Sequence, residues 1–217
     1  MDKHIVSNYD NDLDLLKNMI IEMGVILEKQ VFLAVELVKV NNDETAQNII
    51  ETEKKINLSE KKIREFATNT LSKRQPLADD LRKILISIQL SGTLERIGDH
   101  AANITTRVSK AKTVPNTYVT DSIYRLGQSV VKILSQALTS YDESSENLAA
   151  NIADQDKEID LLYETCFREH LVLMMEQNNN IGYCAQMLFI AKELERIGDL
   201  SKNIGEEVLY SIRGKLL

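Results

Sequence analysis

The sequence predicts an all-α protein made of two tandem, pseudo-symmetric, antiparallel three-helix bundles with six long helices. Its 217 residues include only two prolines, eight glycines, no tryptophan and 5% aromatic residues, a composition that favours helices over strands. Apolar residues recur at spacings of three and four along most of the chain, as helix packing in a bundle requires. The segment LERIGDHAANI at 94–104 returns as LERIGDLSKNI at 194–204. This repetition indicates an internal duplication.

Turn signals separate the six helices. Residues 41–43 (Asn-Asn-Asp) end the first helical run, and residues 74–76 (Arg-Gln-Pro) end the second, because proline disfavours helical backbone in the residue before it. Residues 114–116 (Val-Pro-Asn) form the expected linker between the halves, and residues 142–144 and 178–180 divide the second half. We expect helices near 10–40, 44–73, 77–111, 118–140, 145–176 and 181–212, within a first repeat over 1–113 and a second over 117–217.

The overall charge and hydropathy exclude several classes of protein. The formal net charge of −7 repels nucleic acid, so no nucleic-acid partner is expected. The first ten residues have no apolar segment like that of a signal peptide, and Glu22, Glu28 and Glu36 interrupt the longest apolar stretches. Cys166 and Cys184 fit neither a CxxC motif nor a disulfide framework, and we expect reduced core residues. These features predict a cytoplasmic protein that does not span a membrane.

The third helix of each repeat carries a column of acidic residues. Glu95, Asp99 and Asn103 stand at i, i+4 and i+8, which places them on one face of the helix. The same column continues towards the N-terminus through apolar or small residues, so the acids interrupt an apolar stripe. The second repeat has the equivalent column Glu195, Asp199 and Asn203. Like charges at this spacing destabilise a helix by roughly 0.2–0.5 kcal/mol, which calls for a compensating role.

The second helix of each repeat supplies facing acids. Glu53 and Glu60 occupy positions of the apolar register of the first repeat, and Asp156 does so in the second. Four residues after Glu53 stands Asn57, and four residues after Asp156 stands Asp160. The midpoint in sequence between residues 53 and 99 is residue 76, and the midpoint between residues 156 and 199 is 177.5. Both midpoints fall on an expected turn. Each acid pair on the second helix is therefore level with the pair on the third, about 30 Å from the turn.

Partly buried acids that face one another must take up protons or share cations. An oxygen-only ligand set suits hard ions such as Mg²⁺, Mn²⁺, Ca²⁺ or iron, and no Glu-x-x-His motif of a ferritin-type site is present. The alternative is a set of helical ion pairs, Arg96 with Asp99 and Arg196 with Asp199. That alternative leaves Glu95 and the facing acids unexplained. His100 has Leu200 as its counterpart in the repeat and is expected at the surface.

The sequence contains no motif that activates a nucleophile or holds a nucleotide: no Gly-rich phosphate loop, GxSxG or GxGxxG is found. Two rivals to a metal-binding regulator stay open. A dinuclear metal-dependent phosphoesterase would also need clustered carboxylates, but no His or Lys near the acids in sequence is expected to serve as its acid or base. A metal-free helical adaptor would keep the same acids ion-paired or protonated.

The chain resembles the PhoU family over essentially its whole length. The resemblance is carried by Glu-Arg-Ile-Gly-Asp followed by Asn-Ile in both halves, and by Lys73-Arg74-Gln75-Pro76 followed by Asp80-Leu81-Arg82. In the second half Asp156, Asp160 and Tyr163, followed by Phe167-Arg168-Glu169, also fit the family pattern. Family members are accessory and regulatory proteins of phosphate-specific transport with six antiparallel helices in two bundles.

The resemblance implies that acid-x-x-x-acid motifs bind a multinuclear metal cluster in each bundle, with iron, manganese, magnesium or zinc as candidates. Asn57 departs from the acidic pattern, so the first site is expected to be weaker or to hold fewer ions. The resemblance also implies a non-enzymatic homodimer that contacts the ATPase subunit of the phosphate ABC transporter and a membrane-bound sensor histidine kinase, meeting the membrane only through these partners. The expected ligands are Glu53, Asn57, Glu60, Glu95, Asp99, Asp156, Asp160, Glu195 and Asp199, supported by Asn103, Asn203, Arg96, Arg196 and Tyr163.

Overall fold

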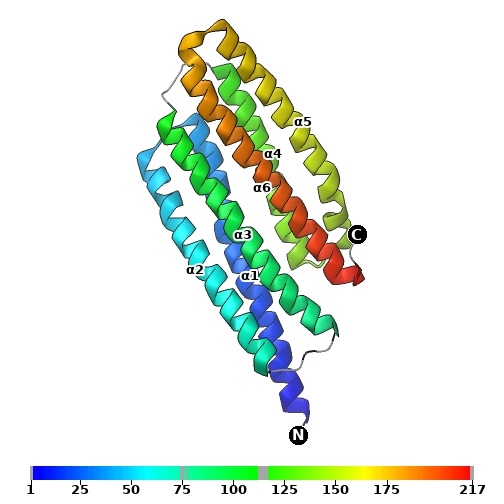
Figure 1. Cartoon of the computed structure of the whole chain (residues 1–217). Helices are drawn as coiled ribbons and strands as arrows, with labels where there is room; N and C mark the ends of the chain where they lie inside the picture. The colour runs from blue at the N-terminus through cyan, green and yellow to red at the C-terminus, as the bar shows by residue number, and fades with distance from the viewer. Residues whose placement is uncertain (1, 74–75, 77, 112–116, 216–217) are drawn as a thin grey trace.

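The computed structural model describes residues 2–73, 76, 78–111 and 117–215, and its side chains are described from residue 11 onward, Thr117 excepted. Within these residues the chain forms six long α-helices and one short 3₁₀-helix, η1, at Asn178–Asn180. Figure 1 shows the helices running alternately up and down the long axis of the molecule. Their bounds are α1 (Asp2–Lys39), α2 (Asp43–Lys73), α3 (Ala78–Lys110), α4 (Thr117–Asp142), α5 (Glu146–Glu176) and α6 (Ile181–Arg213).

The predicted fold class is confirmed, and most helix bounds lie within two residues of those expected. The first helix is the exception: it starts at Asp2 rather than near residue 10. The expected start was wrong because no Pro or Gly stands between residues 2 and 23 to stop a helix. The linker at 114–116 lies outside the described residues, and so does the first turn except for Pro76.

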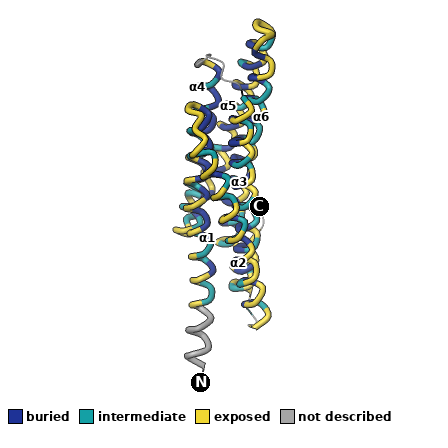
Figure 2. The backbone as a smooth tube through the Cα atoms, turned by 90° about the vertical axis from the view of Figure 1, so that its left-hand side faces the viewer, coloured by how far each residue is buried: buried dark blue, intermediate teal, exposed yellow. Residues whose placement is uncertain are grey.

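The six helices form two layers. α2, α3, α6 and α5 lie side by side in one layer, and α1 and α4 form the other, as two views at right angles show (Figures 1 and 2). α1 packs against α2 and α3, and α4 packs against α5 and α6, which makes the two three-helix bundles. The bundles meet where α3 packs on α6 and α1 packs on α4. Equivalent helices of the two repeats therefore pair with each other.

One hydrophobic core runs through both repeats. It includes Leu27, Ile56 and Ile97 of the first repeat and joins them to Ile133 and Ile197 of the second, all at most 1% exposed. Figure 2 shows the buried residues on the inner sides of the helices and the exposed ones on the outer sides. Cys166 and Cys184 are free and buried, as expected. Among the described residues, no helix contains an apolar stretch long enough to cross a membrane.

Glycines allow α1 and α4 to approach closely at the junction of the repeats. A Cβ built on Gly127 would stand 2.6 Å from Cγ1 of Val35, closer than real side chains approach. Val35 is only 1% exposed, so it has little room to move. Gly92 on α3 differs, because a Cβ there would meet no neighbouring atom within 4 Å.

A polar contact joins the repeats between α3 and α6. Nδ1 of His100 lies 2.6 Å from Oε2 of Glu193, and their side chains are only 14% and 13% exposed. His100 was expected at the surface, and that expectation was wrong because the packing of α3 on α6 covers it. Burial raises the pKa of Glu193, but hydrogen bonds from His100 and Asn103 outweigh this effect, and the net pKa lies below the ordinary value.

Candidate metal centres

Two carboxylate clusters lie on the four-helix layer. The first lies between α2 and α3, and the second between α5 and α6. α1 packs against one side of α3, and α4 packs against one side of α6. Asp99 on α3 and Asp199 on α6 are exposed, so both clusters open to the face of the layer opposite α1 and α4. We define the first cluster as Glu53, Asn57, Glu60, Glu95 and Asp99, and the second as Asp156, Asp160, Glu195 and Asp199.

In the first cluster, α2 and α3 bring their acids to one level, as the sequence predicts. Burial raises the pKa of Glu95, and the negative charges of Asp99, Glu60 and Glu53 raise it further, whereas Arg64 lowers it. Glu95 therefore lies in the field of acids from both helices. Such a site favours either a proton or a cation.

Asn57 has an oxygen atom without a hydrogen-bond partner, whereas Glu60 is ion-paired. Glu60 is 8% exposed and forms an ion pair with Arg64, four residues further along α2. Nδ2 of Asn57 donates to Oε1 of Glu53 at 2.5 Å. Oδ1 of Asn57 is buried without a hydrogen-bond partner, whereas Oε1 of Glu60 is the atom that contacts the Arg64 guanidinium. Buried oxygens of this kind are suited to an additional donor or a cation.

The second cluster has the same arrangement but contains two lysines. Nζ of Lys202 lies 3.1 Å from Oδ2 of Asp156, which is 4% exposed, and Nζ of Lys192 lies 2.6 Å from Oε2 of Glu195. The hydrogen bond that Lys202 donates to the Asp156 carboxylate raises the pKa of Lys202, so the lysine stays protonated. These amines supply part of the positive charge that a metal ion would otherwise provide.

The neighbouring carboxylates still repel the two exposed acids of the second cluster, Asp160 and Asp199. Burial raises the pKa of Asp199, and the charges of Glu195, Asp156 and Asp160 add to that increase. Burial also raises the pKa of Asp160, followed by the effects of Asp156 and Glu195, while Lys202 and Lys192 act in the opposite direction. The two lysines therefore neutralise this cluster only in part.

The residues expected to support the ligands take varied positions. The ring of Tyr163 lies under Nζ of Lys192, 5.4 Å from its centroid, at the edge of the second cluster. Asn103 is directed to Glu193 across the junction of the repeats rather than to the first cluster. Asn203, Arg96 and Arg196 are exposed. Of the ion pairs found among the described side chains, none joins Arg96 to Asp99 or Arg196 to Asp199, so the alternative ion-pair network is not the one that forms.

The donor set fits a hard cation, but the side chains do not converge on one. No three acidic, His or Cys side chains in the described part of the chain come together closely enough to hold a metal ion. Three observations favour a cation: the ligands are all oxygen atoms, the pKa values of Glu95, Asp160 and Asp199 are raised, and Oδ1 of Asn57 has no partner. Binding would require rotation of the carboxylates, which the exposed Asp99 and Asp199 have space to make.

Sequence reasoning missed the function of the lysines. Lys192 stands three residues before Glu195, a spacing that places the two on one face of α6. At the same offset of 100 residues, Lys202 corresponds to Ala102 and Lys192 to Gly92 in the first repeat. A comparison of the two copies for charge differences would have found both lysines.

A six-helix fold of two repeats, each with carboxylates between its second and third helices, defines a class of duplicated helical-bundle proteins. The family model described as "PhoU domain" matches the chain twice, at residues 20–108 and 123–208. The chain therefore belongs to the PhoU family.

Full-length relatives and solved structures agree with this assignment. The chain is 38% identical over 212 residues to the "Phosphate-specific transport system accessory protein PhoU homolog" of Xylella fastidiosa (strain Temecula1), covering 98% of this chain and 88% of that protein. The protein of the same name from Zymomonas mobilis is 36% identical over 98% of this chain and 90% of its own length. The crystal structure of PhoU from Pseudomonas aeruginosa has a TM-score of 0.91 and 33% identity, covering 95% of this chain and 100% of that one.

Proposed function

We propose that this protein is a non-enzymatic, cytoplasmic regulator of inorganic phosphate uptake and of phosphate-starvation signalling. In this role it is an adaptor that binds metal clusters and contacts the ATPase subunit of the phosphate ABC transporter and a membrane-bound sensor histidine kinase. The observation that carries the proposal is that both repeats place carboxylates of two neighbouring helices at one level, where their negative charges repel one another. The chain is also similar over nearly its full length to proteins named for phosphate-specific transport.

The metal ligands would come from both helices of each hairpin. Glu53, Glu95 and Asp99 would contribute carboxylates in the first repeat, with Oδ1 of Asn57 as a neutral ligand. A bound hard cation would neutralise the carboxylates and offer open positions to an anion or to a partner's carboxylate. The ligands of the second repeat would be Asp156, Asp160, Glu195 and Asp199.

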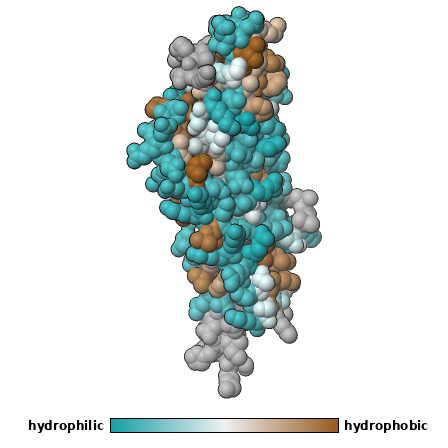
Figure 3. Space-filling view, turned by 60° about the vertical axis from the view of Figure 1, so that its left-hand side comes forward, coloured by the Kyte–Doolittle hydropathy of each residue, from teal (hydrophilic) through white to brown (hydrophobic). Residues whose placement is uncertain are grey.

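An adaptor contacts its partners through its surface, and the surface of this protein carries both hydrophilic and hydrophobic side chains. The face in Figure 3 is largely hydrophilic, with hydrophobic side chains in separate small groups. Phe32 and Val25 on α1 are 48% and 63% exposed, and Met175 near the end of α5 is 83% exposed. These side chains are candidates for contacts with a second copy in a homodimer or with the partner proteins.

The regulatory part of the proposal is tested in cells that lack their own copy of this gene. Phosphate uptake is measured after return of the wild-type gene, or of a gene with Glu95, Asp99, Glu195 and Asp199 all replaced by Ala. We expect the wild type to restrain uptake in phosphate-rich medium and the variant to leave it unrestrained at equal protein level. Full restraint by the variant would show that the clusters are not needed.

The metal part is tested by elemental mass spectrometry on tag-free protein. We expect iron or manganese in the wild type, with part lost in a Glu95→Ala/Asp99→Ala variant and part in a Glu195→Ala/Asp199→Ala variant. Metal content at background in a folded wild-type protein would rule out the clusters and leave a metal-free adaptor.

A further inference from the structure

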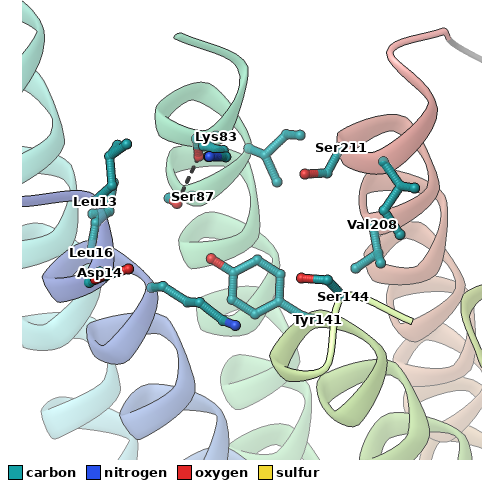
Figure 4. Close-up of a pocket in the computed structure, with 12 residues that line it drawn as sticks. Leu13, Asp14, Leu16, Lys83, Ser87, Tyr141, Ser144, Val208 and Ser211 are labelled. Atoms are coloured by element: carbon teal, nitrogen blue, oxygen red, sulfur yellow. Dashed lines mark hydrogen bonds between the residues drawn. The ribbon is translucent and has the colours of Figure 1, made fainter. Parts of the chain in front are cut away.

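A cavity of about 250 Å³ lies at the junction of the two repeats, away from both carboxylate clusters. It is enclosed by α1, α3, the end of α4 with the turn that follows it, and the last turns of α6 (Figure 4). Because each repeat supplies two of these elements, the cavity exists only in the assembled chain. Its size suits a small molecule rather than a protein segment.

The lining of this cavity is positively charged, although the whole protein carries a net charge of −7. Lys17 and Lys83 line it, and Asp14 is the one acidic side chain among its described lining residues. Nζ of Lys17 donates to the carbonyl of Asp142 at 2.6 Å and lies 3.9 Å from Oδ1 of the same residue, a loose ion pair that leaves further N–H donors open to an anion. Lys83 forms only a loose pair with Asp80, at 3.6 Å with its side chain 59% exposed. Both ammonium groups can therefore bind an anion.

Hydroxyl groups add neutral donors to the two amines. Ser144, Ser211 and Tyr141 direct their hydroxyl oxygens toward the cavity (Figure 4). In the described structure, the side chains of Ser144 and Ser211 make no hydrogen bond with another residue, whereas Ser87 donates to the carbonyl of Lys83 at 2.9 Å. Burial raises the pKa of Tyr141, so its hydroxyl stays protonated at neutral pH. Hydroxyls and amines at one place are the donors that phosphate oxygens accept from.

Apolar side chains complete the walls. Leu16 and Ile86 are each 1% exposed, and Val208 is 2% exposed, so the walls are fixed by core packing. Apolar walls lower the local dielectric constant and strengthen the attraction between an ammonium group and an anion. They also offer contact area to an apolar group attached to that anion.

We propose that the inter-repeat cavity binds a phosphate-bearing small molecule, with the phosphoryl oxygens held by Lys17, Lys83 and the hydroxyls of Ser144 and Ser211. The ligand is either inorganic phosphate or a phosphomonoester whose organic part contacts the apolar walls. The choice of phosphate among small anions rests on the proposed function, whereas the anion site itself rests on the lining.

The test is isothermal titration calorimetry on chelator-treated full-length protein, with inorganic phosphate, phenyl phosphate and sulfate as separate probes. We expect saturable binding of phosphate or phenyl phosphate. A preference of tenfold or more for phenyl phosphate would identify an organic ligand, and equal affinities would identify inorganic phosphate. Absence of binding by both phosphate probes, or a preference for sulfate, would overturn the proposal.

Variants locate the site. Lys17→Gln/Lys83→Gln should lower the affinity about a hundredfold or more, because two charged hydrogen bonds to the anion are lost. The control Lys54→Gln/Lys62→Gln removes the same charge from the exposed face of α2 and should leave the affinity within about twofold. Asp14→Asn should raise the affinity about threefold by removing the opposing charge.

Two further variants distinguish loss of anion binding at the cavity from loss of folding and from loss of the carboxylate clusters. Ser211→Leu adds an apolar side chain in place of a hydroxyl and should abolish binding without lowering the thermal stability. The Glu95, Asp99, Glu195 and Asp199 quadruple variant should bind the probes as the wild type does, because the clusters are elsewhere. Binding lost with the acids, or kept in both lysine and Ser211 variants, would refute the cavity as the site. These outcomes do not depend on the uptake assay, so the two proposals fail separately.

Discussion

Removal of the Lys202 amine should destabilise the metal-free protein. Lys202→Met keeps most of the side chain and leaves the buried Asp156, 4% exposed, without its counter-charge at 3.1 Å. Breaking a fully buried pair costs about 3–5 kcal/mol, and the 37% exposure of the Lys202 side chain reduces this to about 2 kcal/mol. For a chain of this length that corresponds to a fall of about 4–8 °C in Tm.

The same variant should respond more strongly to metal. Without Lys202 the second cluster has one positive charge fewer, so its affinity for Mn²⁺ should increase. Mn²⁺ at about 100 times its Kd would stabilise the folded state by about 2.7 kcal/mol, enough to reverse the loss. The assay is the Tm of wild type and variant, each with chelator and with Mn²⁺.

The repeat provides matched controls. Asp156→Asn combined with Lys202→Met removes both charges and should restore the Tm in chelator. Ala102→Lys places an amine at the position in the first repeat that corresponds to Lys202, and it should weaken the Mn²⁺ response of the first cluster. An unchanged Tm of Lys202→Met in chelator, or equal Mn²⁺ shifts in variant and wild type, would refute this account of the lysine as an internal counter-ion.

Three further predictions concern packing, pH and the junction of the repeats. Gly127→Ala should destabilise the protein by about 1–3 kcal/mol through overpacking, whereas Gly92→Ala, with open space around it, should stabilise it by about 0.5–1 kcal/mol, both measured by urea unfolding. Burial lowers the pKa of His170 below its ordinary value of 6.5, so the unfolded chain binds a proton that the folded protein excludes, and stability should fall as pH drops below 6.5. A His170→Phe variant should lack this part of the pH dependence. His100→Leu should destabilise by about 1–3 kcal/mol, because it leaves the part-buried Glu193 with the hydrogen bond from Asn103 but without that of His100. Adding Glu193→Thr, the residue at the equivalent position of the other repeat, should recover most of the loss in a double-mutant cycle.

Clear outcomes would contradict each of these. Equal effects of the two glycine variants would mean that α1 and α4 separate freely at Gly127. Identical pH profiles for wild type and His170→Phe would show that His170 takes up its proton as readily in the folded protein. Additive effects of the His100 and Glu193 substitutions would show that the two side chains do not interact.

The fold could be predicted because its signals are local or repeated. Pro76 and the Asn-rich segment at 178–180 mark turns, and the repeated LERIGD segment reveals the duplication. How the two repeats pack on each other could not be predicted, because apolar periodicity identifies a buried face without naming its partner. His100 shows the consequence: its sequence neighbours suggest exposure, and only the packing of α3 on α6 buries it.

The carboxylate clusters could be predicted from spacing and level, since helices have a fixed rise per residue. The countercharges were harder to predict. Lys202 reaches Asp156 from another helix, and a lysine on a long, flexible side chain can point in many directions. The expectation drawn from Asn57 alone did not include these countercharges: Arg64 pairs with Glu60 in the first cluster, and Lys202 and Lys192 pair with Asp156 and Glu195 in the second.

The pairing of α3 with α6 and of α1 with α4 has an evolutionary consequence. Equivalent surfaces meet as they do in an isologous dimer, so an ancestral single repeat could have dimerised through this surface before gene fusion joined the copies. The present junction is no longer self-complementary. His100 on one side meets Glu193 on the other, whereas two copies of the second repeat would bury Glu193 against Leu200. Fusion followed by such divergence favours pairing of unlike repeats and disfavours exchange of like repeats between chains.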